Sequence, residues 1–258
     1  MFCPGSCEGK NCGACRTYGV KDPQKRFTAA REMLVDAACV TVPSHFVANT
    51  MAQEFPGLCP CVIPHGIDPS FAATQTRTST RRIIYVGTLA PLKGVAFLLR
   101  AFKKLRGDVS LEIYGGGAIG YVHSLKKIAS GDSRIVFRGE IPADQMPGIY
   151  QEADCIVVPS IWFETYNFVL REALSSGCIA VVSDMGAMPE AVRIGGNGFL
   201  FEAGNEEALL AALEKAHRFD WEKYSRQTFP RIEDEAVDYA AIYEVALETR
   251  LRGDKHGS

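Results

Sequence analysis

From Arg82 onwards the chain alternates between short apolar runs and longer amphipathic stretches, and this alternation limits the possible folds more than any other feature. The short runs are rich in β-branched residues and end in glycine or a polar turn, as strands do. The longer stretches carry apolar residues at helical spacing. Strands that alternate with helices form βαβ units, which build a parallel sheet with flanking helices. We predict strands at 82–86, 110–114, 134–137, 155–158, 179–183 and 198–201, and helices at 92–105, 119–129, 143–152, 168–176, 187–192 and 206–217.

The rest of the chain divides into shorter segments. Cysteines and glycines crowd its start, two amphipathic stretches and two short β-branched runs follow, and the last part resembles one long helix. Small polar residues from Ala72 to Thr80 show no periodicity and predict a linker. We therefore expect a Cys-rich segment at 1–20, a partial domain with its linker at 21–71, an α/β domain at 72–225 and a C-terminal helix with a tail at 226–258.

Charge and hydropathy exclude two classes of protein. The 28 basic and 30 acidic residues give a net charge of −2, whereas a nucleic-acid-binding protein normally shows a basic excess, so we expect no nucleic-acid partner. No apolar run approaches the roughly 18 residues of a membrane helix, so we expect no membrane span. The first residues lack the basic and apolar regions of a signal peptide. We expect a cytoplasmic protein, either free or peripheral at a membrane.

The most specific local signal lies in residues 160–177, directly after a predicted buried strand. Glu164 and Glu172 stand eight residues apart in this segment. If Asn167 caps the following helix, Glu164 lies on the loop and Glu172 on the second turn, so both carboxylates can face one ligand. The N–H groups of the first turn can hold a phosphate, and each carboxylate can accept sugar hydroxyls. The alternative is a pair of solvated surface glutamates.

A second motif supports a different function. The run from Gly115 to Gly120 matches G-x-G-x-x-G, follows a predicted strand and precedes a predicted helix, and Glu140 follows twenty residues later. This pattern is typical of dinucleotide-binding sites and would indicate an NAD-dependent dehydrogenase. Two observations count against it: the motif falls on the second βαβ unit rather than the first, and residues 121–124 are less apolar than such a helix requires.

Several segments together resemble the retaining glycosyltransferases of the GT-B fold, in particular family 4, the glycosyl transferases group 1. These segments keep their order and spacing from about Ala38 to the end of the chain; they are 62–68, 85–94, 136–142, the glutamate pair and 183–190. The resemblance implies the C-terminal, donor-binding domain of a GT-B fold, with residues 21–71 as a remnant of the N-terminal acceptor domain. The implied ligand is a nucleoside diphosphate sugar, a UDP- or GDP-sugar.

The resemblance also implies roles for individual residues. Lys93 would neutralise the donor diphosphate and Glu164 would bind the transferred sugar, which makes these two the expected catalytic residues. Glu172 would bind the ribose, and the backbone near Ile141 would hold the base. The glycine of the first loop, Gly87, would let the backbone approach the donor. The donor-binding residues expected on this basis are Gly87, Thr88, Lys93, Gly115, Gly117, Ile141, Tyr166, Asn167, Phe168, Val169 and Glu172.

Two residues depart from the family pattern. Thr88 stands where many relatives carry arginine, so the diphosphate would have one positive partner fewer. Asn167 replaces a frequent glycine, which is a mild change because asparagine tolerates left-handed backbone. The implied chemistry is retaining transfer through an oxocarbenium-like state, with front-face attack and no cofactor required for catalysis. Positioning and charge stabilisation of the leaving diphosphate would then account for most of the rate.

The length of the chain is the larger departure. A GT-B enzyme has two Rossmann-like domains with the active site between them, and residues 1–68 are too few for a full second domain. We expect either a truncated enzyme or a chain completed by another polypeptide. The alternative is a non-catalytic nucleotide-sugar-binding subunit that works only with a partner chain.

The first segment carries a possible metal site. Cys3, Cys7, Cys12 and Cys15 follow the spacing C-x3-C-x4-C-x2-C, and four thiolates suit a structural zinc ion or an iron–sulfur centre. The last pair has the spacing of a zinc knuckle, whereas the first pair is less regular. The alternative is a loop whose thiols contact a missing domain.

Overall fold

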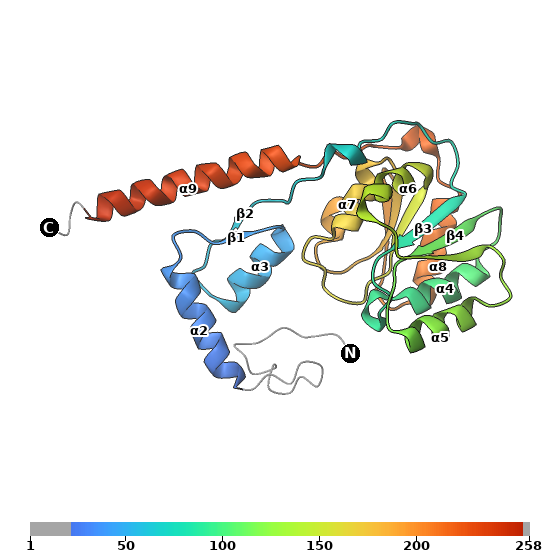
Figure 1. Ribbon diagram of the computed structural model, residues 1–258, viewed down its shortest axis with the longest axis horizontal. Coiled ribbons are helices and arrows are strands. Elements are labelled where there is room, and N and C mark those ends of the chain that lie inside the picture. Colours follow the sequence, from blue (N-terminus) through green and yellow to red (C-terminus); the bar gives the residue numbers. More distant parts are fainter. Residues whose placement is uncertain (1–21, 255–258) are drawn as a thin grey trace. The chain divides into compact units, whose positions relative to one another are not determined.

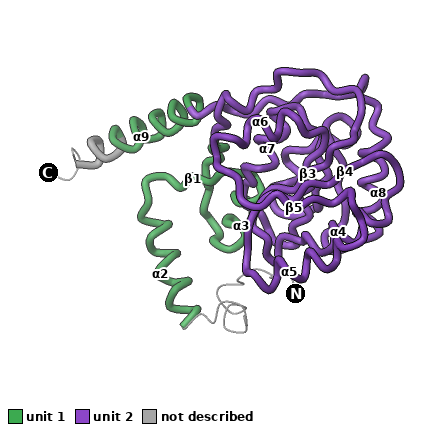
Figure 2. The backbone as a smooth tube through the Cα atoms, turned by 45° about the vertical axis from the view of Figure 1, so that its right-hand side comes forward, with its two compact units in different colours: residues 1–65, 233–258 green, residues 66–232 purple. Residues whose placement is uncertain are grey.

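The computed structural model describes residues 22–254, with side chains described as far as Glu248. The chain forms two compact units (Figure 2). Unit 1 comprises residues 1–65 and 233–258, and unit 2 comprises residues 66–232.

Unit 2 is built on a parallel sheet of six strands in the order β5-β4-β3-β6-β7-β8. The chain therefore winds outwards from β3 to one edge and then from β6 to the other. This is the strand order of doubly wound nucleotide-binding folds, whose ligands bind where the winding reverses. The predicted fold class, a Rossmann-like parallel sheet with flanking helices, is confirmed. The strands are β3 (Arg82–Val86), β4 (Ser110–Tyr114), β5 (Ile135–Gly139), β6 (Cys155–Val158), β7 (Ile179–Ser183) and β8 (Gly198–Phe201).

Helices cover both faces of this sheet (Figure 1). One face carries α4 (Val95–Lys104), α5 (Ile119–Ala129) and α8 (Glu206–His217), and the other carries α6 (Met146–Glu152) and α7 (Phe168–Ser175). Neighbouring residues of each strand point to opposite faces, so Ile83 joins the first core cluster and Ile84 the second. Both are fully buried. The central strands β6 and β7 are fully buried and almost wholly apolar because neither of their faces meets water.

The helices form where packing and capping agree. In α4, Leu98 and Leu99 are fully buried against the sheet, and burying such a side chain contributes roughly 1.5–3 kcal/mol. Helix α8 begins at a cap in which Asn205 Oδ1 accepts hydrogen bonds from the N–H groups of Glu207 and Ala208, at 3.1 and 3.0 Å. Such a cap satisfies two of the N–H groups that every helix leaves unpaired at its start.

The helix predicted at 92–105 is divided in two. A 3-10 turn, η2 (Pro91–Lys93), precedes α4, and Gly94 separates them with a φ of +72°. A Cβ atom on Gly94 would lie 1.8 Å from the carbonyl oxygen of Pro159. The chain bends here because the loop after β3 packs directly on the loop after β6.

The prediction of a helix at 187–192 is wrong, because only the 3-10 turn η4 (Pro189–Ala191) forms there. Val192 already has extended backbone angles. The N–H group of Arg193 donates to Asn197 Oδ1 at 2.6 Å instead of continuing a helix. In the same way, η3 (Ala143–Gln145) precedes α6 where one helix at 143–152 was predicted.

Unit 2 also extends beyond the boundaries predicted at 72 and 225. The presumed linker contains Arg77, whose buried guanidinium donates to the carbonyl oxygens of Ala153 and Ser176 at 2.7 and 3.0 Å. The N–H group of Ile67 donates to the Pro230 carbonyl at 2.8 Å. Residues 66–71, with η1 (Pro69–Phe71), and residues 226–232 therefore belong to unit 2, as does η5 (Trp221–Lys223) just before the second of these segments.

Unit 1 is small. Its helices are α2 (Pro23–Asp36) and α3 (His45–Glu54), and β1 (Thr41–Val42) pairs in parallel with β2 (Cys61–Val62). The last helix, α9 (Ile232–Asp254), belongs to this unit from residue 233 onwards. Its Glu235 lies 2.9 Å from His65 Nδ1. Within residues 22–254 no helix combines the length and apolarity that crossing a membrane requires.

Candidate functional site

The loops that follow β3 and β6 meet at the point where the winding of the sheet reverses. The N–H group of Ile161 donates to the Leu92 carbonyl at 2.8 Å, which ties the two loops together. Ligands of doubly wound sheets bind beside the carboxyl ends of the strands at this point. The fold therefore places the two predicted catalytic residues, Lys93 and Glu164, at the expected ligand position.

Lys93 and Glu164 form an ion pair. Lys93 Nζ lies 2.7 Å from Glu164 Oε1, and the same oxygen accepts a hydrogen bond from Ser160 Oγ at 2.9 Å. The Glu164 side chain is 14% exposed and that of Lys93 is 36% exposed, so solvent and small ligands can reach the pair. Two residues separated by 71 positions thus form one charged centre.

The loop after β7 fixes the backbone of Glu164. The N–H group of Ala187 donates to the Glu164 carbonyl at 2.8 Å. Gly186 has a φ of +63°, and a Cβ atom on it would lie 2.5 Å from that carbonyl oxygen. The glycine allows the third loop to pack against the second, which holds the Glu164 backbone in place.

Helix α7 begins as the sequence predicted. Asn167 has a left-handed φ of +65°, and its Oδ1 accepts a hydrogen bond from the N–H group of Leu170 at 2.9 Å. Phe168 and Val169 form the start of the helix, and the N–H groups of a first helical turn attract anions. The cap also places Glu172 on the second turn.

Glu172 lies half-buried against α6. Tyr150, which is fully buried, donates its hydroxyl to Glu172 Oε2 at 3.1 Å. Burial raises the pKa of the Glu172 carboxyl above its usual range, and the hydrogen bond from Tyr150 offsets part of that rise. Burial makes this carboxylate costly to keep charged, so hydroxyl donors from a ligand would stabilise its charged form.

The glycine run after β4 packs on the loop after β3. A Cβ atom on Gly115 would lie 1.9 Å from the Gly87 carbonyl oxygen, and one on Gly117 would lie 2.2 Å from the Leu89 carbonyl oxygen. In a dinucleotide-binding turn the second glycine leaves room for a pyrophosphate and the third allows close helix packing. Here the protein's own backbone fills the space at Gly117, and a Cβ atom on Gly120 would contact nothing within 4 Å. The packing therefore disfavours the dehydrogenase alternative.

Three further predicted residues differ in their exposure. Thr88 is exposed, and its carbonyl accepts a hydrogen bond from Tyr85 at 2.9 Å. Ile141 is half-buried at the carboxyl end of β5. Tyr166 is only 3% exposed. The ring is buried because it packs under the guanidinium of Arg171, 3.8 Å from the ring centre.

Sequence reasoning missed two residues that shape the site. Ser160 is buried and bonds Glu164, and Arg171 is buried and donates to the carbonyl oxygens of Tyr166 and Ala187. The position of Ser160 directly after a buried strand was the available signal for its role. The sequence carried no such signal for Arg171, because an arginine on an amphipathic helix is normally solvated.

No metal centre is found in the part of the chain that the structure describes. Among those residues, no three or more His, Cys, Asp or Glu side chains come together in a group that could hold an ion. The predicted cluster of Cys3, Cys7, Cys12 and Cys15 lies outside the described residues.

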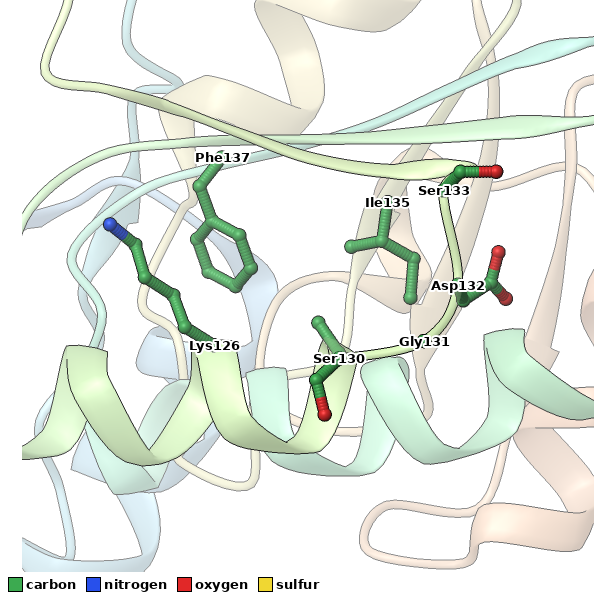
Figure 3. Close-up of a pocket in the computed structure, with 8 residues that line it drawn as sticks. Lys126, Ser130, Gly131, Asp132, Ser133, Ile135 and Phe137 are labelled. Carbon is green, nitrogen blue, oxygen red and sulfur yellow. The ribbon is translucent and has the colours of Figure 1, made fainter.

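A surface groove with a volume of about 530 Å³ lies away from this centre, between the end of α5 and edge strand β5 (Figure 3). Phe137 and Ile135 point into it from β5, and Lys126 Nζ lies 5.9 Å from the centre of the Phe137 ring. The turn at 130–133, which leads into the amino end of β5, forms its other side. None of its lining residues is a predicted site residue.

Parallel strands in this order, covered by helices on both faces, define the class: a Rossmann-like α/β protein that matches structures of GT-B glycosyltransferases. The sequence then gives the family. Residues 80–218 match the family described as glycosyl transferases group 1, and the chain belongs to it. The family resemblance inferred from the motifs is thereby confirmed.

Individual relatives agree with this assignment. The chain is similar to the GDP-mannose-dependent alpha-(1-6)-phosphatidylinositol monomannoside mannosyltransferase of Mycolicibacterium smegmatis, at 28% identity over 72% of this chain and 54% of the relative. More generally, it spans about half the length of the curated relatives it matches.

Solved structures show the same fold. Sucrose-phosphate synthase from Thermosynechococcus elongatus matches with a TM-score of 0.75 at 18% identity, over 92% of this chain and 65% of that one. Anabaena HepE in complex with UDP and glucose matches with a TM-score of 0.67 at 20% identity, over 92% of this chain and 68% of that one.

Proposed function

We propose that this chain is the donor-binding half of a retaining glycosyltransferase and binds a nucleoside diphosphate sugar at the carboxyl ends of β3 and β6. The observation that carries the proposal is the Lys93–Glu164 ion pair at the switch point of the sheet, with Glu172 on the adjoining helix. These groups supply one cation for a diphosphate and two carboxylates for hydroxyl groups.

Each part of the proposed ligand has a matching group in the chain. The diphosphate would lie near Lys93 and the start of α7, since the lysine carries a positive charge and the start of a helix carries a partial positive charge. The ribose would bind Glu172, because a half-buried carboxylate gains stability from two hydroxyl donors. The transferred sugar would bind Glu164, and the backbone near Ile141 would hold the base.

The proposed reaction retains the configuration of the transferred sugar. The bond between the anomeric carbon and the diphosphate oxygen breaks, and the acceptor oxygen forms a new bond to that carbon on the same face through an oxocarbenium-like state. The proton of the acceptor hydroxyl passes to the leaving diphosphate oxygen. Lys93 and the start of α7 would stabilise the negative charge that develops on the leaving diphosphate. This chemistry requires no metal ion.

The donor base is the first property to measure. The solved HepE structure contains UDP, and the mycobacterial relative is named for GDP-mannose, so both bases have a precedent among similar proteins. We would record thermal unfolding of the chain with UDP, GDP, ADP and NAD in turn. A ligand at 100 times its Kd adds about 2.7 kcal/mol to stability. We expect a rise in Tm with UDP or GDP and none with NAD.

The site assignment is tested with Glu172→Ala. Loss of the two ribose hydrogen bonds should weaken binding of the responding nucleotide at least tenfold. Glu207→Ala is the matched control, because Glu207 is an exposed glutamate on α8, outside the proposed site. Unchanged affinity in Glu172→Ala, or a Tm rise with NAD alone, would contradict the proposal.

A second candidate function is that of a non-catalytic nucleotide-sugar-binding subunit that acts with a partner chain. Unit 1 favours it, because Met33 and Val35 on α2 and Val237, Tyr243 and Leu247 on α9 are all more than half exposed. Exposed apolar groups of this kind often mark contact surfaces. Donor hydrolysis by the isolated chain would exclude this candidate, whereas donor binding without turnover would favour it.

A further inference from the structure

Glu164 uses its two carboxylate oxygens differently. Lys93 Nζ and Ser160 Oγ both donate to Oε1, at 2.7 and 2.9 Å. A carboxylate oxygen accepts about two hydrogen bonds, so Oε1 is saturated. No described residue donates a hydrogen bond to Oε2. The side chain is therefore held at one oxygen and open at the other.

The hydroxyl of Ser160 has a defined direction. It has one hydrogen to donate, and its Oγ lies 3.4 Å from the carbonyl oxygens of Leu92 and Trp162 but 2.9 Å from Glu164 Oε1. The carboxylate is both the nearest and the only charged acceptor, so it takes the hydrogen. The N–H group of Trp162 meanwhile donates to Ser160 Oγ at 3.3 Å.

The position of Ser160 is itself fixed from the next strand. Ser183, at the end of β7, donates its hydroxyl to the Ser160 carbonyl at 2.6 Å. Both serines are at most 1% exposed. A buried polar chain therefore runs from Ser183 through Ser160 to Glu164. Water does not compete for it, so its hydrogen bonds hold their geometry firmly.

We propose that Ser160 is a positioning residue that holds Glu164 so that Oε2 alone accepts hydroxyl groups of the transferred sugar. This inference rests on the proposed function, because it requires a sugar next to Glu164. Lys93 cannot replace Ser160 in this role, since a diphosphate would draw the lysine away from the carboxylate. Ser160 would then be the remaining protein donor to Oε1 while the donor substrate is bound.

The test compares a nucleotide with its sugar conjugate. Using calorimetry, we would measure Kd for UDP and UDP-glucose, or for GDP and GDP-mannose if GDP is the nucleotide that stabilises the chain. In Ser160→Ala we expect affinity for the conjugate to fall about tenfold and affinity for the nucleotide alone to change less than about twofold. Ser160→Thr keeps the hydroxyl and should recover most of the lost affinity.

Ser176→Ala is the matched control. Ser176 is also a fully buried serine, and its hydroxyl donates to the Phe71 carbonyl at 2.9 Å, away from Glu164. It should leave both Kd values unchanged. Equal losses for nucleotide and conjugate in Ser160→Ala, or no loss for either, would overturn the positioning role while leaving the proposed function intact. If the parent chain binds neither ligand, the proposed function fails and this inference fails with it.

Discussion

Two glutamates of unit 2, Glu112 and Glu164, are each held by basic side chains, and the difference between them separates a structural group from a binding group. Glu112 on β4 accepts hydrogen bonds from Arg82, Tyr114 and Arg138, at 2.8, 2.5 and 2.9 Å, and these donors occupy both of its oxygens. Its side chain is 8% exposed. Glu164 is nearly as buried, yet only its Oε1 accepts hydrogen bonds from described residues.

The pKa of Glu112 reflects this closed arrangement. Burial by itself would raise it, but the hydrogen bonds from Arg138, Tyr114 and Arg82 outweigh burial and lower it to about 2. Glu172 shows the opposite balance, because burial raises its pKa and a single tyrosine offsets little. A carboxylate with all its partners stabilises the fold, whereas one with too few has capacity for a ligand.

The largest expected effect is that of Glu112→Ala. The change leaves Arg82 half-buried without its main partner, and breaking a buried ion pair costs about 3 kcal/mol. Urea unfolding at pH 7 measures this loss. The control is Glu152→Ala, whose side chain also pairs with Arg82 but is 68% exposed, so its loss should cost less than about 0.5 kcal/mol. If Glu112→Ala and Glu152→Ala lost similar amounts of unfolding free energy, the buried Glu112 would be no more important to stability than the exposed Glu152.

Acid titration should show an effect of nearly the same size. The pKa of Glu112 is about 2 in the folded chain and 4.5 ordinarily, so its stabilisation is complete above pH 4.5 and disappears as the pH falls towards 2. A difference of this size corresponds to about 3 kcal/mol. The gap in unfolding free energy between the parent and Glu112→Gln should stay constant from pH 7 to 5 and then close. A gap that persists at pH 2 would contradict the assignment.

Glu164→Ala should have a smaller effect on stability and a larger one on ligand binding. Because Lys93 is 36% exposed, water can replace its partner, and we expect a loss of about 1 kcal/mol or less. Affinity for the nucleoside diphosphate sugar should fall at least tenfold, while affinity for the nucleotide alone should change little. Urea unfolding measures the loss of stability, and calorimetry on the same preparation measures the two affinities. A stability loss as large as that of Glu112→Ala would make Glu164 a structural residue.

Glu172→Gln should have the smallest effect on stability, and it should be favourable. The raised pKa means that the folded chain binds this proton more tightly than the unfolded chain, so the parent loses stability as the pH rises above 4.5. The amide still accepts the hydroxyl of Tyr150 but carries no buried charge. We expect the variant to gain a few tenths of a kcal/mol over the parent at pH 8 and nothing at pH 4. Comparing the Tm of the variant and the parent at pH 8 and at pH 4 tests the sign of this change in stability.

The sequence alone determined the local part of this structure. Five of the six predicted strands have the predicted bounds, because apolar β-branched runs between turn residues leave few alternatives. Helices α5 and α8 also begin and end at the predicted residues. The Asn167 cap was predictable because a cap depends on its own side chain and the next three residues. The family resemblance likewise followed from motifs that each span a few residues.

Only the tertiary structure decided which of these residues meet. The sequence places Arg77 in a predicted linker. In the fold its guanidinium donates to the carbonyl groups of Ala153 and Ser176, which lie 76 and 99 residues away in the sequence. The Lys93–Glu164 pair, the Ser160 hydrogen bond that leaves Oε2 open and the closed Glu112 cluster all join different strands or their loops. A sequence fixes local conformation through neighbouring residues, whereas these contacts depend on how distant strands align in the sheet.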